Sequence, residues 1–450
     1  MIAVKNIEIK GLFDQFNVDV PLGLQANIFV GENGMGKTTI LNCLYAVLSG
    51  KIEKLSNINF DSIAVYFKDG TNAGITSQDA IAYNEHLFKG GAVRRRINFE
   101  TIFTSREIEI MQNYNEINDV DLAKFIYRIS DTYMMPTNYA ERELRRYMIG
   151  LKKEKKKGNY KNVIKFKEVI ESKVKEEVIY FPTYRRIEED LNKLGIHVDR
   201  ERNSFNDKLI QFGMNDVDKV IEKLLDEIKL KAINGFNKMT GILLNQYLHA
   251  QLELNKVEEI DRDSLVIALD RLGDEINKSD KMKIIELVEN NKMMEAENEY
   301  LLNLIMNLIS SYKEQSSIDE KIKSFSNTCN KYLNDKKYIY DESNVDLKIF
   351  RNNYKWPIEI QNLSSGEKQV ISIFAKLYFE IDDKCILLFD EPELSLSIKW
   401  QSMFLPDVID TKKCSMLVAV THSPFIFDND FDEIALDMSD CIRDKNVQVN

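Results

Sequence analysis

The feature that most constrains the fold is a glycine-rich stretch near the N-terminus, residues 31–39, which fits the pattern G-x-x-x-x-G-K-[ST]. An apolar run at 26–30 precedes it and predicts a buried strand, and apolar residues at helical spacing follow it at 38–48. In such a turn the backbone N–H groups converge, and the helix N-terminus adds unpaired N–H groups and a positive dipole end. The stretch therefore predicts a phosphate-binding P-loop in an α/β fold, rather than a chance glycine turn.

This loop supplies the first candidate site residues. Lys37 is expected to reach the β- and γ-phosphates of a nucleotide, and the Thr38 hydroxyl is expected to hold Mg²⁺. A P-loop alone specifies only nucleotide phosphate, so the rest of the chain must narrow the reaction. The candidates for phosphate contact are Gly31, Asn33, Gly34, Gly36, Lys37, Thr38 and Thr39.

Composition excludes several classes of protein. The net charge of −11 argues against a chain that wraps a nucleic acid over its whole surface. The five cysteines are scattered without C-x-x-C spacing, which argues for a reducing compartment and against a zinc module. We find no signal peptide and no window of 18 uncharged apolar residues. The expectation is a cytoplasmic protein with no membrane partner.

Hydrophobic patterns predict a core interrupted by helical insertions. Strands are expected at 2–10, 16–20 and 61–70, and an apolar run at 178–182 predicts a strand that returns to the core sheet. Strands resume at 338–350, after which strands and helices alternate to about residue 440, as in a parallel α/β sheet. The predicted division is two halves of one core at 1–90 and 338–450, helical insertions at 91–176 and 188–337, and a core strand region at 177–187.

A second candidate cluster lies in the C-terminal third. Residues 385–392 form an apolar strand that ends in Asp390 and Glu391. An Asp at the end of a buried strand near a P-loop is the usual second support of Mg²⁺, and the adjoining Glu391 is placed to polarise a water for attack on the γ-phosphate. The alternative is that the two acids are only a helix N-cap and its neighbour.

Two further segments flank this strand. Upstream, a Ser-Ser-Gly turn opens a helix predicted at 369–379, and its N-terminal N–H groups would form a second anion site. Downstream, a strand at 416–420 leads to His422, which could contact the γ-phosphate or the attacking water, although a lone histidine is more often structural. The candidates in the upstream turn are Ser364, Ser365, Gly366 and Glu367.

The order P-loop, Leu-Ser-Ser-Gly-Glu, apolar strand with Asp-Glu-Pro, and Thr-His-Ser resembles the ABC-type ATPases of the SMC/RecF/OLD branch. The resemblance implies ATP and Mg²⁺ as cofactors and a head-to-tail homo-oligomer, in which Ser364 and Gly366 of one protomer meet the γ-phosphate on another. By the same likeness Asp390 resembles the Walker B metal ligand, Glu391 the catalytic base and His422 the switch histidine.

Two departures from the family pattern matter. The signature reads Ser-Ser-Gly-Glu rather than the transporter Ser-Gly-Gly-Gln, which favours the non-transporter branch. In the segment that resembles the D-loop, residues 394–397, Ser397 stands where many relatives carry a histidine, which puts one contact across the dimer in doubt. No glutamine of this sequence is assigned to the Q-loop of the family.

The spacing of the two halves along the chain helps to choose among the groups of this ATPase branch. Residues 70–338 separate the two halves, which is too long for a transporter subunit, and the regular heptads of a chromosome-scaffolding SMC protein are absent. With no Toprim domain after the Thr-His-Ser strand, the chain resembles the stand-alone ATPases of bacterial anti-phage systems, first AriA of PARIS and next PtuA of Septu and certain retrons. That likeness implies an ATPase scaffold with no nuclease activity of its own, an effector nuclease partner of the Toprim or HNH type, and a phage-encoded trigger.

The rival class is a RecF-like DNA-binding repair ATPase. Its support is the lysine run at 152–167, which could neutralise phosphates or could be a solvated helix face, and the same alternatives apply to Arg94–Arg96. Arg185 and Arg186 follow a predicted core strand and could serve the nucleotide, the effector or a structural ion pair. A purely structural protein would require an inactive P-loop, and nothing favours this because Lys37, Thr38, Asp390 and Glu391 are all present.

Overall fold

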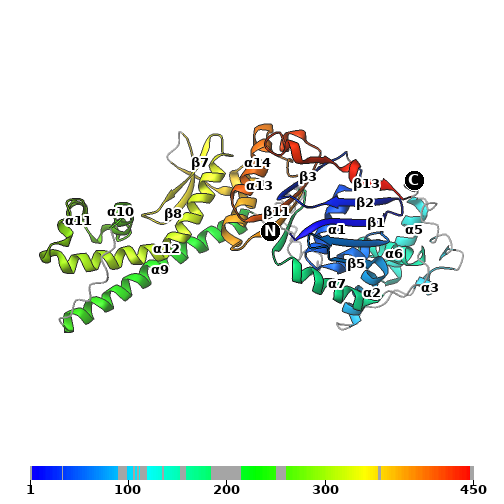
Figure 1. Ribbon diagram of the computed structural model, residues 1–450, viewed down its shortest axis with the longest axis horizontal. Coiled ribbons are helices and arrows are strands. Elements are labelled where there is room, and N and C mark those ends of the chain that lie inside the picture. Colours follow the sequence, from blue (N-terminus) through cyan, green and yellow to red (C-terminus); the bar gives the residue numbers. More distant parts are fainter. Residues whose placement is uncertain are drawn as a thin grey trace.

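The computed structural model describes residues 3–32, 34–89, 99–104, 107–108, 111, 119–133, 136–152, 159–183, 214–249, 260–352 and 356–445. These residues form an α/β head from which a long pair of helices projects (Figure 1). Among the described helices, none combines the length and apolarity that crossing a membrane requires.

The centre of the head is a five-stranded sheet in the order β12-β3-β11-β10-β6, in which every neighbouring pair is parallel. All six residues of β10 are buried, because helices cover both faces of the sheet and a continuous apolar run is then favoured. The predicted return strand is confirmed, since β6 pairs with β10 along its length. The strands are β3 (Ala26–Val30), β6 (Glu177–Phe181), β10 (Cys385–Asp390), β11 (Cys414–Thr421) and β12 (Ala435–Asp437).

The two faces of this sheet carry different helices. Ile386 and Leu388 of β10 pack in one core cluster with α1 (Lys37–Leu48). Leu387 and Phe389, which alternate with them and so point to the other face, pack with α13 (Ser365–Ala375) and α14 (Ile398–Asp410). The P-loop helix and the helix of the Ser-Ser-Gly turn therefore lie on opposite faces of one sheet.

A second sheet, antiparallel in its pairings, has the order β13-β2-β1-β4-β5 and packs over the α1 face. It confirms the strands predicted around the P-loop. Two helices pack beside it, α2 (Ser77–Lys89) and α7 (Tyr160–Lys173). The strands are β1 (Val4–Leu12), β2 (Phe16–Pro21), β4 (Ser62–Phe67), β5 (Asn72–Thr76) and β13 (Ile442–Asp444).

A third sheet corrects one expectation. The strands predicted at 338–350 do not join the parallel sheet but form an antiparallel sheet of β7 (Lys336–Asp341), β8 (Asp346–Arg351) and β9 (Pro357–Ile358). The physical reason is the short connection between β7 and β8, since a tight turn joins only antiparallel neighbours.

The projecting arm is made by α9 (Met214–His249) and α12 (Glu299–Asn330). Helix α9 runs outward from the head core and α12 returns to it, and Gly235 allows close approach because a Cβ there would lie 1.9 Å from Ser311 Oγ. Helices α10 (Arg262–Asp270) and α11 (Lys278–Glu289) complete a small core near its tip (Figure 1).

On the far side of the head, α3 (Phe99–Ile102), α5 (Asp119–Tyr133) and α6 (Thr137–Lys152) share a small apolar cluster. Short helical turns complete the described structure: Ile52–Asn57, Gly273–Glu275, Lys292–Met294, Ala296–Asn298, Ile360–Asn362, Lys376–Glu380, Pro424–Ile426, Asp432–Ile434 and Met438–Cys441.

Candidate nucleotide site

The P-loop has the backbone that phosphate binding requires. Gly34 and Gly36 have φ of 91° and 81°, in the region that favours glycine, and Gly36 is the N-cap of α1. This helix begins without a side-chain cap and without an acidic residue in its first turn, so its first N–H groups remain available to an anion. Gly31 and Thr39 lie in the same segment, and Asn33 lies outside the described residues.

Lys37 lies over this loop and is only 5% exposed. Its Nζ donates hydrogen bonds to the carbonyls of Gly31, at 2.6 Å, and of Glu32, at 3.2 Å. The ammonium is thus already at the loop, where a phosphate oxygen would replace these carbonyls as the acceptor.

The predicted metal ligands come together. Thr38 Oγ1 lies 3.2 Å from Asp390 Oδ1, although the two residues are 352 positions apart. Both are hard oxygen donors, as Mg²⁺ prefers, and Mg²⁺ usually takes one or two protein ligands with waters and substrate phosphates. Within the described part of the chain, no group of three or more His, Cys, Asp or Glu residues could hold a metal. The oxygens of Thr38 and Asp390 are donors of the kind that a nucleotide-bound Mg²⁺ would take.

Two residues missed by the sequence analysis fix the second oxygen of Asp390. From the end of β6, Tyr180 OH donates to Oδ2 at 3.3 Å and Thr183 Oγ1 donates at 3.1 Å. Burial, and then the negative charge of Asp390, raise the pKa of Tyr180 far above its usual range, so the phenol stays a donor. Only the strand order could have revealed them, because it places β6 beside β10.

A third missed residue is Phe13, in the turn between β1 and β2. Phe13 has φ of 56° and is 40% exposed, and its Cε2 would lie 3.1 Å from a Cβ at Gly36. The exposed ring lies against the P-loop, so it is a candidate contact for a bound nucleotide. Its sequence signal is weak, because a single Phe in a turn has many explanations.

The carboxylate and histidine beyond the strand ends also meet. Because β10 and β11 are parallel neighbours, Glu391 and His422 emerge at the same edge, and Glu391 N donates to the Val420 carbonyl at 2.9 Å. His422 Nδ1 lies 3.9 Å from Glu391 Oε1 and 3.1 Å from Glu393 Oε1. The His422 side chain is 42% exposed, so it is not simply a core histidine.

The Ser-Ser-Gly turn differs in detail from the prediction. Helix α13 begins at Ser365, four residues earlier than expected, with a capping box in which Ser364 Oγ accepts from Glu367 N and the Glu367 carboxylate accepts from Ser364 N. Both carboxylate oxygens also lie 2.8 Å from Lys336 Nζ. These contacts occupy part of the predicted anion site, and Glu367, 4% exposed, supports the turn through its side chain.

The close packing at position 366 explains why a glycine follows the two serines. A Cβ at this position would lie 2.3 Å from the Ser395 carbonyl oxygen, in the segment after the Asp-Glu-Pro strand. Ser397, where a histidine was expected from relatives, caps α14 by accepting from Trp400 N at 3.4 Å. The turn and the D-loop-like segment are therefore in direct contact within one chain.

Part of the basic segments lies among the described residues. Lys161 and Lys165 are exposed on α7, while Lys167 Nζ donates to Tyr83 OH at 3.4 Å. The other residues predicted to contact nucleic acid or an effector lie outside the described residues: Lys153 and Lys155–Lys157, Arg94–Arg96, and Arg185 with Arg186.

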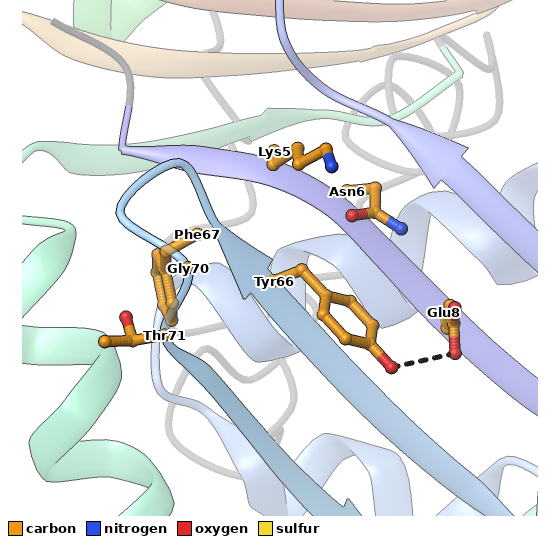
Figure 2. A pocket seen from close by; sticks show the side chains of 7 residues that line it. All are labelled: Lys5, Asn6, Glu8, Tyr66, Phe67, Gly70 and Thr71. Carbon is orange, nitrogen blue, oxygen red and sulfur yellow. Dashed lines mark hydrogen bonds between the residues drawn. The ribbon is translucent and has the colours of Figure 1, made fainter.

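A depression of about 390 Å³ lies elsewhere, on β1, β4 and the turn after β4 (Figure 2). Its lining includes Lys5 and Asn6, and Tyr66 OH donates to Glu8 Oε2 at 3.2 Å. No residue that lines it belongs to the P-loop or to the Asp390 edge. It is a polar patch of the antiparallel sheet, separate from the nucleotide site.

Comparison with known proteins adds one decisive finding. A family model described as an AAA ATPase domain matches residues 3–427. A search of curated proteins returned no match. Solved structures that align include an Smc head domain with an extended coiled coil bound to the C-terminal domain of ScpA, from Pyrococcus furiosus (14% identity, 95% of this chain and 91% of that chain, TM-score 0.33). An Smc head domain with a coiled coil and joint, from Pyrococcus yayanosii, also aligns (15% identity, 95% and 93%, TM-score 0.28).

Proposed function

The chain belongs to the AAA ATPase domain family, and from that premise we propose that it is an ATP-gated oligomeric scaffold that controls a separate effector nuclease in a bacterial anti-phage defence system. The observation that carries the ATPase part is the meeting of Thr38 and Asp390 beside an uncapped P-loop helix. The defence role rests on the sequence resemblance to AriA of PARIS and PtuA of Septu, with a Toprim or HNH nuclease as partner.

In this proposal each residue at the sheet edge has one task. Lys37 and the free N–H groups of α1 bind the phosphates, while Thr38 and Asp390 hold Mg²⁺, which neutralises charge on the transferring phosphoryl group. Glu391 orients and activates the attacking water, and His422 contacts the γ-phosphate.

The arrangement of α1 and α13 supports a site shared between two copies. The two helices pack on opposite faces of the central sheet, which favours closure of the P-loop by Ser364 and Gly366 of a second copy. A head-to-tail homo-oligomer would supply the missing turn in trans, as the family resemblance implies. ATP then acts as the bridge that controls assembly.

The arm supports a docking role for the insertion. Five large apolar side chains of α9 are between 51% and 78% exposed, and at their helical spacing they share one side of the helix. Contiguous exposed apolar patches often mark protein interaction sites. The residues are Leu230, Ile233, Phe236, Leu244 and Leu248.

The test is co-expression of the chain with its genomic neighbours, followed by purification and mass determination, for wild type and for Glu391→Gln. We expect a nuclease subunit in a stable complex, and we expect a phage protein to release or activate it. Leu244→Glu should abolish this association, while the matched control Lys238→Glu, on an exposed position of the same helix, should preserve it.

Two outcomes would overturn the proposal. Nuclease activity of the purified chain alone would remove the need for an effector. A chain that retains no partner, dimerises only with ATP and shifts DNA with a steep dependence on salt would instead establish the RecF-like repair ATPase.

A further inference from the structure

The segment after the Asp-Glu-Pro motif holds a third acidic residue, Glu393, which is 4% exposed. A carboxylate is seldom buried this deeply unless it is paired, because burial disfavours its charged form. One of its oxygens, Oε1, accepts a hydrogen bond from the His422 backbone N at 3.0 Å and lies 3.1 Å from His422 Nδ1. The same atom therefore holds both the main chain and the ring of one histidine.

The other oxygen of Glu393 has no such partner. Oε2 is buried and makes no hydrogen bond within the described part of the chain. A buried, unsatisfied acceptor is costly and rare in native structures, so each one calls for a specific explanation. Burying Glu393 with one unsatisfied oxygen costs stability, and the contacts of its other oxygen with His422 offer a reason for that cost.

The backbone on both sides of Glu393 adopts an unusual conformation that orients this side chain. Glu391 and Ser395 have φ of 51° and 68°, a region that non-glycine residues seldom adopt. Next to His422, Ser423 Oγ donates to Gln401 Oε1 at 2.6 Å, and Ser423 N donates to Thr421 Oγ1 at 3.0 Å. Both chain segments that meet at the imidazole are therefore fixed.

We propose that Glu393 is the positioning residue for His422 in nucleotide hydrolysis. The Glu393 carboxylate accepts a hydrogen bond from the protonated Nδ1 of the ring. This contact sets the tautomer and leaves Nε2 for the γ-phosphate or the water, as a carboxylate orients a histidine in other sites. Glu391, at 3.9 Å from Nδ1, remains available for the water. This inference rests on the hydrolytic role proposed above for His422.

The test compares single-turnover and steady-state ATP hydrolysis by Glu393→Ala, Glu393→Gln, His422→Ala and the double variant Glu393→Ala/His422→Ala. We expect Glu393→Ala to lower kcat by about tenfold to a hundredfold, the range that orienting partners typically contribute. The KM for ATP and the nucleotide affinity should change little. The double variant should be no slower than His422→Ala, because Glu393 acts through the histidine.

A spectroscopic readout separates positioning from general structural support. With selective ¹⁵N labelling, NMR resolves the ring tautomers of the histidines, of which the chain has four. The His422 signals should report a fixed Nδ1–H form in wild type and a mixture in Glu393→Ala. Glu393→Gln, whose amide oxygen can still accept from both donors, should retain the fixed form and a higher kcat than Glu393→Ala.

The failures are distinguishable. If His422→Ala is slow but Glu393→Ala hydrolyses ATP at the wild-type rate, or the two losses multiply in the double variant, the positioning role is wrong. If His422→Ala hydrolyses normally, the role of the histidine in the proposed function fails as well. Glu433→Ala, an exposed glutamate in the following segment, serves as the matched control and should behave as wild type.

Discussion

Replacing Gly366 by alanine tests the contact between the Ser-Ser-Gly turn and the segment that follows the Asp-Glu-Pro strand. A Cβ at this position would lie 2.3 Å from the Ser395 carbonyl oxygen, whereas ordinary contact begins at 3.4 Å. The obstacle is backbone, and Ser395 is already in the left-handed region with φ of 68°, so it has little freedom to yield. One of the two segments must therefore move by about 1 Å, a displacement that can cost about a hundredfold in rate at a catalytic site.

The assay is steady-state ATP hydrolysis with a parallel measurement of nucleotide affinity. We expect Gly366→Ala to lower kcat by about tenfold to a hundredfold and to leave the Kd for ATP nearly unchanged, because the P-loop lies on the other face of the sheet. Gly241→Ala is the matched control, since a Cβ there meets nothing within 4 Å and helix propensity favours alanine by about 1 kcal/mol. Wild-type hydrolysis by Gly366→Ala would refute the reasoning.

Three further predictions follow from other contacts. Phe13→Ala should raise the Kd for ATP by about fivefold, or about 1 kcal/mol of lost stacking, and Phe13→Tyr should retain affinity; equal affinities by calorimetry would exclude the contact. Lys336→Met leaves the buried Glu367 carboxylate without its cation and should cost about 3 kcal/mol of unfolding free energy, whereas Lys336→Met/Glu367→Met should recover part of it in urea titrations. Burial raises the pKa of Asp218 in the folded protein above its ordinary value. The charged carboxylate therefore destabilises the fold at pH values above the folded-state pKa, and this penalty disappears as the pH falls below the pKa of the unfolded chain. Asp218→Asn should raise the melting temperature at pH 7 and have little effect near pH 3.

Much of the nucleotide site could be predicted because its parts are local. The strand, glycine turn and helix of the P-loop occupy consecutive residues, and the backbone angles of Gly34 and Gly36 follow from the glycines themselves. The acids at the end of β10 are likewise a local signal, because an apolar run that ends in carboxylates can be recognised from consecutive residues alone.

The support around that site could not be predicted in the same way. Tyr180, Thr183 and Phe13 become relevant only when β6 is placed beside β10 and the β1–β2 turn is placed over the P-loop. Each is an ordinary residue in its own segment, so neither a motif nor the hydrophobic pattern around it predicts its role. The same holds for Glu393, whose partner is a histidine 29 residues away.

The sequence by itself therefore determined the candidates for the chemistry of the site: the residues proposed to bind phosphate, the oxygens proposed to hold Mg²⁺, and the buried strand that ends in the two acids. Tertiary structure alone decided the strand order, the opposite placement of α1 and α13, and the separation of β7 and β8 into a sheet of their own. The physical reason is that glycine conformations and apolar periods act over a few residues, whereas strand pairing and face assignment depend on contacts between residues hundreds of positions apart, as Thr38 and Asp390 are.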